Sequence, residues 1–226
     1  MAQIRTFLVT GSNQGLGKHT VHQLASTPNV VVFMGSRKIA AAEEALAGFA
    51  PDIHASSTVV PLQLDITDDA SIKAAYTTIS EYLKAKNLSG LDVLINNAAV
   101  AVPSFRECYE VNVFGTVTLT ETLFPLINPN GTILNISSGM GSHALRPLMP
   151  DLPAAPAYSS SKSALNQLTK SGIRVISICP GFNATKLNGF TGTMAPEDGA
   201  KIIVSSALEK DGRTGVFIHK DGDYPW

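Results

Sequence analysis

Cysteine, charge and long apolar runs are all scarce in this sequence. Two cysteines, Cys108 and Cys179, are too few for a disulfide framework, and neither has a partner at metal-ligand spacing. No apolar run approaches the roughly 18 residues that span a bilayer, and the stretch before Gly11 is too short for a signal peptide. We therefore expect a cytoplasmic protein with no metal and no membrane contact.

The charges nearly cancel, with 17 basic and 18 acidic residues and a formal net charge of −1. This balance lacks the positive excess of nucleic-acid-binding proteins, so we expect no nucleic acid partner. Apolar residues make up 44% of the 226 residues, which is enough for a sizeable core. We expect a single domain over residues 1–226.

Short apolar runs alternate with helical patterns along the chain, which indicates a parallel sheet with helices on both faces. The expected strands are residues 6–10, 30–34, 58–64, 91–95, 132–136, 173–178 and 214–218. The clearest helical spacing covers residues 68–85, with Thr67 as the expected cap. The pattern predicts an α/β, doubly wound domain with a mostly parallel seven-stranded sheet.

The first expected strand runs into a glycine-rich turn, residues 10–17, that precedes a helical segment. Glycines at such a turn let the backbone approach a pyrophosphate at the N-terminus of the helix. The expected contacts with a nucleotide are Gly11, Ser12, Asn13, Gly15, Leu16 and Gly17.

Arg37 lies twenty residues beyond Gly17, at the end of the second expected strand. An acidic residue here would accept hydrogen bonds from a ribose 2′-hydroxyl, whereas an arginine suits a 2′-phosphate. The sign of this charge predicts NADP(H) as the cofactor.

Further motifs follow in a fixed order over nearly the whole chain. They are Asp65-Ile66-Thr67, Asn96-Asn97-Ala98-Ala99, Asn112, Ser137-Ser138, Tyr158-x3-Lys162 and Pro180-Gly181-x3-Thr185. With the glycine-rich turn, they make the chain resemble the short-chain dehydrogenase/reductase family. The resemblance is nearest to the NADPH-dependent carbonyl reductases, and it implies a Rossmann-type domain.

The resemblance also implies catalytic roles. Tyr158 is the implied general acid and base, and Ser138 holds the substrate carbonyl oxygen. Lys162 lies four residues after Tyr158, on the same face of a helix, where its charge is expected to lower the pKa of the phenol. By resemblance, Lys162 also hydrogen-bonds the nicotinamide ribose, Tyr158 contacts the cofactor, and Asn112 supports a proton-relay water.

Four more residues are implied to contact the cofactor. Asp65 and Ile66 correspond to adenine contacts, Asn97 to the ribose region on the adenosine side, and Thr185 to the nicotinamide carboxamide.

The chain departs from the family pattern in several segments. Ala99 replaces a glycine and would be strained at a positive φ. The helix over residues 157–171, with Gly172 as its C-cap, is shorter than in typical members. Because this helix often forms the dimer interface, the choice between monomer and homodimer stays open.

These observations favour a reductase that transfers hydride from NADPH to an aldehyde or ketone, with Tyr158 supplying the proton. The reverse oxidation of an alcohol uses the same residues. The alternative is an NADP(H)-binding protein, or a truncated isoform, with little or no turnover. A nucleotide-sugar epimerase is disfavoured because the chain has little room for a sugar-binding subdomain. A lipophilic substrate is expected from the apolar residues of two loops, Leu145, Leu148, Met149, Leu152, Phe182, Leu187 and Phe190.

Overall fold

A computed structural model describes residues 3–148, 155–168 and 173–226. One sheet runs through the molecule in the order β3-β2-β1-β4-β5-β6-β7-β8. Its strands are β1 (Arg5–Val9), β2 (Val30–Ser36), β3 (Thr58–Gln63), β4 (Leu91–Asn96), β5 (Ile127–Ile136), β6 (Arg174–Ile178), β7 (Val216–His219) and β8 (Gly222–Asp223). Neighbouring strands are parallel except for the β7–β8 pair. The predicted doubly wound α/β domain is confirmed.

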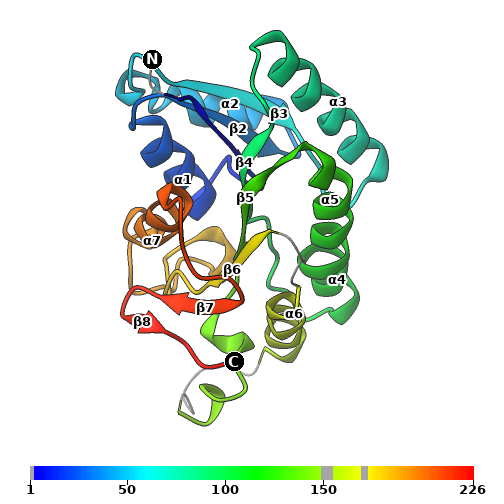
Figure 1. Ribbon diagram of the computed structural model, residues 1–226. Helices are drawn as coiled ribbons and strands as arrows, with labels where there is room; N and C mark the ends of the chain where they lie inside the picture. The colour runs from blue at the N-terminus through cyan, green and yellow to red at the C-terminus, as the bar shows by residue number, and fades with distance from the viewer. Residues whose placement is uncertain (1–2, 149–154, 169–172) are drawn as a thin grey trace.

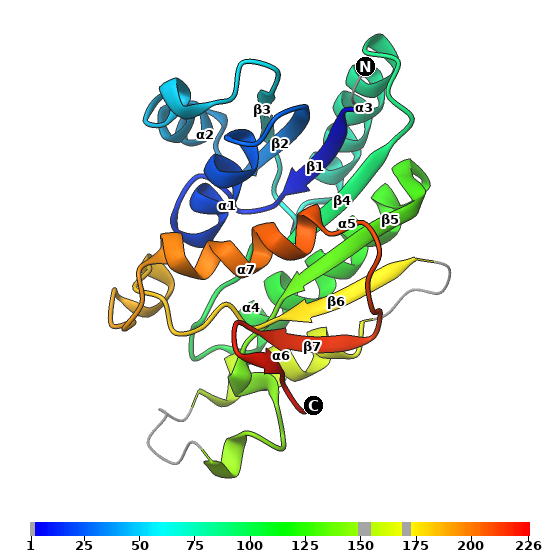
Figure 2. The same ribbon diagram turned by 60° about the vertical axis from the view of Figure 1, so that its left-hand side comes forward.

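Helices cover both faces of the sheet (Figures 1 and 2). One face carries α1 (Gly15–Ala25), α2 (Ile39–Ala47) and α7 (Pro196–Leu208), and the other carries α3 (Asp69–Ala85), α4 (Phe105–Tyr109), α5 (Thr116–Leu123) and α6 (Pro156–Asn166). A π-helical segment, Glu110–Gly115, joins α4 to α5. The short 3₁₀ turns are Ala50–Asp52, Phe124–Leu126, Gly139–Gly141, Arg146–Leu148 and Lys186–Asn188.

Strand β1 shows why the apolar runs form buried strands. Its successive side chains point to opposite faces of the sheet, so Phe7 and Val9 pack with α1 and α7, while Leu8 packs with α3 and α5. All three side chains are fully buried. A strand covered on both sides needs apolar residues at every position, which explains the absence of polar alternation.

Several elements differ from the prediction. Helix α3 is capped by Asp68, whose carboxylate accepts from the Ala70 amide at 2.9 Å; Thr67 instead bonds to Asp65. Strand β5 begins at Ile127, five residues early, through a polar stretch that the apolar pattern could not mark. The two-residue strand β8 is the eighth, against seven expected.

Helix α6 ends at Asn166, before the expected residue 171. The amides of Gln167 and Leu168 bond to carbonyls three residues back, which tightens the last turn, and the Leu168 carbonyl accepts from Asn135 in β5. The expected C-cap, Gly172, lies outside the described residues.

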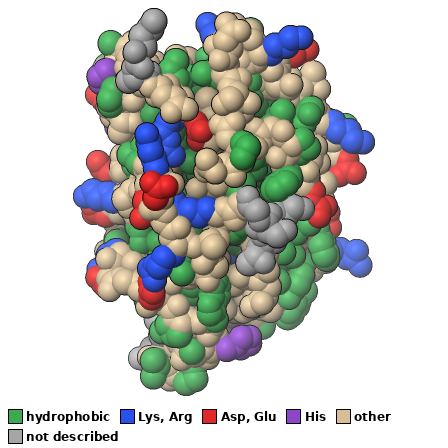
Figure 3. All heavy atoms as spheres, viewed as in Figure 1, with side chains coloured by type: hydrophobic (Ala, Val, Ile, Leu, Met, Phe, Trp, Pro, Cys, Tyr) green, Lys and Arg blue, Asp and Glu red, His purple; other side chains and the backbone are tan. Residues whose placement is uncertain are grey.

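Basic and acidic side chains are intermingled on the face of the molecule in Figure 3. Neither sign of charge dominates that face, consistent with the balanced composition. Among the described residues, no helix combines the length and apolar character needed to cross a membrane, and no cluster of three or more metal-ligating side chains occurs.

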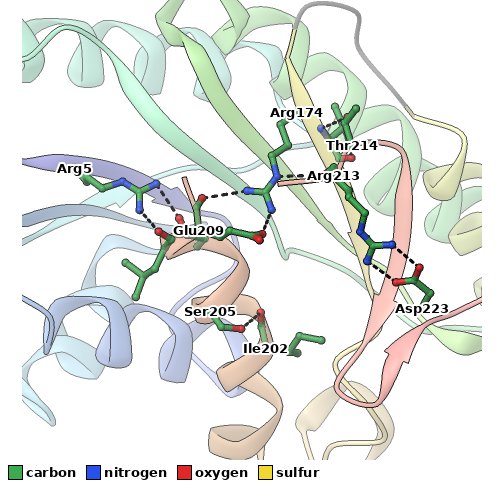
Figure 4. Close-up of polar contacts among 11 residues, drawn as sticks. Arg5, Arg174, Ile202, Ser205, Glu209, Arg213, Thr214 and Asp223 are labelled. Atoms are coloured by element: carbon green, nitrogen blue, oxygen red, sulfur yellow. Dashed lines mark hydrogen bonds and ion pairs between the residues drawn. The ribbon is translucent and has the colours of Figure 1, made fainter. Parts of the chain in front are cut away.

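Two arginines bind the C-terminal end of α7 (Figure 4). Arg5 of β1 donates to the carbonyl oxygens of Leu208 and Ala207 at 2.8 and 2.9 Å. Arg174 of β6 donates to the Glu209 carbonyl at 3.1 Å and pairs with the Glu209 carboxylate. Cations at a helix C-terminus satisfy its free carbonyls, so these contacts hold α7 against the sheet.

We predict that Arg5→Ala lowers the free energy of unfolding by about 1–2 kcal/mol, because two charged hydrogen bonds to α7 are lost. Urea denaturation measures the change. The control is Arg213→Ala, which removes an exposed ion pair with Asp223 and should leave stability nearly unchanged. Equal stability of the Arg5 variant and the parent would contradict the assigned role of Arg5.

Candidate active site

A cleft of about 770 Å³ opens at the carboxyl ends of the parallel strands. In doubly wound sheets this edge is where ligands bind, at the point where the strand order reverses. Here that point lies between β1 and β4. Thirteen of the fifteen site residues expected from the sequence line the cleft: Gly11, Asn13, Gly15, Leu16, Gly17, Arg37, Asp65, Ile66, Asn97, Ser138, Tyr158, Lys162 and Thr185.

The glycine-rich turn requires its glycines for two different reasons. Gly11 and Gly15 have φ values of +59° and +54°, which L side chains rarely adopt. Gly17 has ordinary φ, but a Cβ there would lie 2.6 Å from the Gly11 carbonyl oxygen and 2.6 Å from Asn97 Nδ2. Helix α1 begins at Gly15 without a side-chain cap, so amides of its first turn stay available to an anion.

Ser12 and Asn97 hold this turn in place. Ser12 is buried outside the cleft lining, and both its amide and its hydroxyl donate to the Gly35 carbonyl of β2, at 2.9 and 3.0 Å. Nδ2 of the Asn97 side chain donates to the carbonyls of Thr10 and Gly11, at 2.7 and 3.1 Å. Ser12 therefore supports the backbone of the turn. Its side chain does not face the cleft, although the sequence led us to expect a contact with the nucleotide.

Arg37 and Asp65 lie at the opposite end of the cleft from α6. Arg37 is exposed directly after β2, and no carboxylate within the described part of the chain pairs with it. Asp65 follows β3, where Oδ1 accepts from the amide and hydroxyl of Thr67 at 2.9 and 2.7 Å. At this end of the cleft the Arg37 guanidinium is unpaired among the residues described, whereas the Asp65 carboxylate already accepts two hydrogen bonds from Thr67.

Ser138, Tyr158 and Lys162 come together where β5 meets α6. The Tyr158 phenol is hydrogen-bonded to the Ser138 side chain, whose oxygen also accepts from the Met140 amide at 3.2 Å. Lys162 Nζ donates to the Ile136 carbonyl oxygen at 2.7 Å and lies 5.7 Å from the centre of the Tyr158 ring. A phenol, a hydroxyl and an amine thus share one corner of the cleft.

Burial shifts the pKa values of Tyr158 and Lys162. It raises the pKa of Tyr158 well above its ordinary value, and the hydrogen bond with Ser138 offsets only part of that rise. It lowers the pKa of Lys162 from 10.5 to about 8. The expectation of a lowered pKa for Tyr158 is therefore wrong for this structure, because desolvation of the phenolate outweighs the hydrogen bond with Ser138. At neutral pH the phenol is protonated.

Asn112 sits in the π-helical segment, buried and outside the cleft lining. Its Oδ1 accepts from the Val100 amide, and its Nδ2 donates to the Val100 carbonyl and to Ser161 of α6, each at 2.9 Å. These bonds tie the loop after β4 to α6. The expected support of a relay water stays a prediction.

Only some of the apolar loop residues that were expected to form the substrate pocket line the cleft. Phe182 and Leu187 line it, whereas Leu145, Leu148 and Phe190 do not, and Met149 and Leu152 lie outside the described residues. The non-glycine residues with positive φ in the described ranges are Asn29, Asn87 and Phe190, so Ala99 carries no such strain.

Several lining residues were missed from the sequence: Met140, His219, Lys220 and Tyr224. His219 had a usable signal, because it ends a parallel strand and must therefore reach the same edge as the other strand ends. Tyr224 had none, since it approaches the cleft through β8, which the apolar pattern did not mark.

Comparisons with known proteins agree with this arrangement. A family profile described as short chain dehydrogenase matches residues 5–195. The chain is 34% identical to the short-chain dehydrogenase anuI of Penicillium roqueforti, over 89% of this chain and 88% of the relative. It is 29% identical to carbonyl reductase [NADPH] 1 of Macaca fascicularis over 99% of both. The structure of an NADPH-bound carbonyl reductase from chicken fatty liver superposes with a TM-score of 0.80 at 27% identity, covering both chains fully.

The lowered pKa of Lys162 predicts a pH-dependent cost to stability. Between pH 8 and 10.5 the unfolded chain binds a proton on this amine that the folded chain does not, so stability rises with pH in that range. Relative to Lys162→Met, the wild-type free energy of unfolding should rise by about 1 kcal/mol per pH unit from pH 8 to 10. Denaturant titrations of both proteins at each pH measure this difference. A difference that stays constant with pH would show that Lys162 has the same pKa folded and unfolded.

Proposed function

The chain belongs to the short-chain dehydrogenase family, and we propose that it is an NADP(H)-dependent oxidoreductase that reduces the carbonyl group of an aldehyde or ketone to an alcohol. The observation that carries this proposal is the meeting of Ser138, Tyr158 and Lys162 at one end of a cleft whose other end holds the glycine-rich turn and Arg37. The residues at these two ends would hold the two halves of a dinucleotide.

The residues present fit a phosphorylated dinucleotide. Gly11, Gly15 and Gly17 leave the backbone of the turn open to a pyrophosphate, and a Cβ at Gly15 would point toward Thr185 across the cleft, 3.5 Å from its Cγ2. Arg37 is a free cation where a 2′-phosphate would bind, and bidentate pairing with phosphate is what guanidinium groups do best. Lys162 and Thr185 would hold the nicotinamide half.

NADPH, when bound, supplies the hydride that adds to the carbonyl carbon. Ser138 holds the carbonyl oxygen, on which negative charge develops as the hydride arrives. Tyr158 donates its phenolic proton to that oxygen, which completes the alcohol, and its raised pKa keeps it in the protonated form needed for this step. Lys162 then lies close enough to stabilise the phenolate that remains.

The substrate end of the cleft favours an apolar carbonyl compound. Met140, Phe182, Leu187 and Met194 line it, and Phe182 remains half exposed at its mouth. An apolar surface of this kind binds a substrate more tightly when it buries aromatic or aliphatic groups. We therefore propose lipophilic aldehydes or ketones as the substrate class.

Arg37 should determine the choice of cofactor. In Arg37→Ala we expect the dissociation constant for NADPH to rise about 10- to 100-fold, because a charged hydrogen-bonded pair with the 2′-phosphate is lost, while that for NADH stays nearly constant. Fluorescence titration measures both constants. Lys84→Ala, which removes an exposed cation from α3, is the matched control. An equal loss of affinity for both cofactors would argue against a contact with the 2′-phosphate.

Turnover should depend on the Tyr158 hydroxyl. We predict that Tyr158→Phe lowers kcat by about 100- to 10,000-fold in NADPH oxidation with a panel of aldehydes and ketones, because the general acid is removed. NADPH affinity should change little, and Tyr76→Phe on α3 should leave the rate unaltered. Unchanged turnover in Tyr158→Phe would refute the proposed mechanism. Tight NADPH binding by the wild type without reduction of any carbonyl would favour the non-catalytic alternative.

A further inference from the structure

A histidine outside the family motifs stands in the wall of the cleft. His219 is the last residue of β7, and its side chain is only 9% exposed. Its ring stacks on Tyr224 with centroids 4.6 Å apart and planes 12° apart. Both residues line the cleft. A buried ring held by stacking has a fixed orientation, which is what a recognition residue needs.

The contacts of this ring determine which nitrogen carries the proton. The Asp221 amide donates to Nδ1 at 3.4 Å, so Nδ1 holds the lone pair. The Asp221 carboxylate lies 3.2 Å from Nδ1, but both its oxygens accept from Lys220, at 2.8 and 3.0 Å. Burial also lowers the pKa of His219, so the ring is neutral at pH 7. The proton therefore sits on Nε2.

Nε2 faces the part of the cleft next to the reacting corner. It lies 3.8 Å from where a Cβ of Gly181 would stand, and it has no hydrogen-bond partner among the residues that the structure describes. The Cys179 amide donates to the Ile218 carbonyl and Cys179 Sγ accepts from the Gly139 amide, which aligns the end of β7 with the turn that carries Ser138. Two strand spacings, about 10 Å, separate the ends of β5 and β7.

A small carbonyl compound spans this distance. A donor in the cleft wall that has no partner among the described residues is open to an acceptor supplied by a ligand. We propose that His219 is a substrate-orienting residue, whose Nε2–H donates a hydrogen bond to a second oxygen of the carbonyl substrate. The substrate class is thereby narrowed to aldehydes and ketones that carry a further carbonyl or ester oxygen. This inference rests on the proposed reductase function.

The test compares two ketones of equal length. Ethyl benzoylacetate and hexanophenone share the phenyl ketone and a five-atom chain, and they differ in the ester group. His219→Phe keeps a ring to stack on Tyr224 and removes the donor. We expect its kcat/KM for the keto ester to fall about 10-fold, mainly through KM, with less than a 2-fold change for hexanophenone. His219→Gln, which retains an N–H donor, should recover part of the loss, and His54→Phe at an exposed site should change neither value.

A binding measurement separates this inference from the proposed reaction. With NADP⁺ in place of NADPH no reduction occurs, so calorimetry gives dissociation constants for both ketones in each variant. A selective loss of keto-ester binding in His219→Phe supports the inference even if the wild type reduces neither ketone, an outcome that would count against the proposed function alone. Equal changes for the two ketones, no change, or a wild type that does not bind the keto ester more tightly than hexanophenone would overturn the assignment of His219.

Discussion

Lys162 places an amine inside the protein, where Nζ donates to the Ile136 carbonyl at 2.7 Å, and the site is arranged around that bond. The bond joins α6 to the last residue of β5. It brings Tyr158, one turn earlier on α6, to Ser138, two residues beyond the end of the strand. Burying a cation with one carbonyl partner is costly, and the lowered pKa of Lys162 is the sign of that cost. The bond therefore fixes α6 where Tyr158 meets Ser138, and the burial of Lys162 lowers the stability of the folded protein.

The C-terminal segment supports the same corner from the other side. Ser142 donates to the Pro225 carbonyl at 2.7 Å and the Ala144 amide donates to the Trp226 carbonyl at 3.2 Å, while the Trp226 ring stacks on Phe217 of β7. The turn after Ser138 is thus fixed by residues more than 80 positions away in the sequence. Parallel strands make this possible, because all their carboxyl ends reach one edge and the loops that follow them meet there.

The parts of the structure that the sequence predicts are those with strong local signals. Continuous apolar runs mark buried strands such as β1, and the acidic start and apolar stripe mark α3. The motif residues that line the cleft meet there because each follows a strand end or lies on α6. Local patterns do not reveal partners in space: the sequence does not show that Ser12 would turn to Gly35, or that burial would raise the pKa of Tyr158. Strand β8 is short and polar, and the early end of α6 depends on a contact with β5. Neither feature produces a periodic pattern of apolar residues in the sequence.

The central claim is that this corner delivers a proton from Tyr158 while hydride passes from NADPH to a carbonyl carbon. The most direct test uses NADPH that carries two deuterium atoms at C4 of the nicotinamide ring. The purified protein is incubated with this cofactor and a lipophilic ketone, and the alcohol is analysed by mass spectrometry and NMR. The account predicts one deuterium on the carbinol carbon and none on the hydroxyl after exchange with water. An alcohol without deuterium on that carbon, or no alcohol at all, would contradict it.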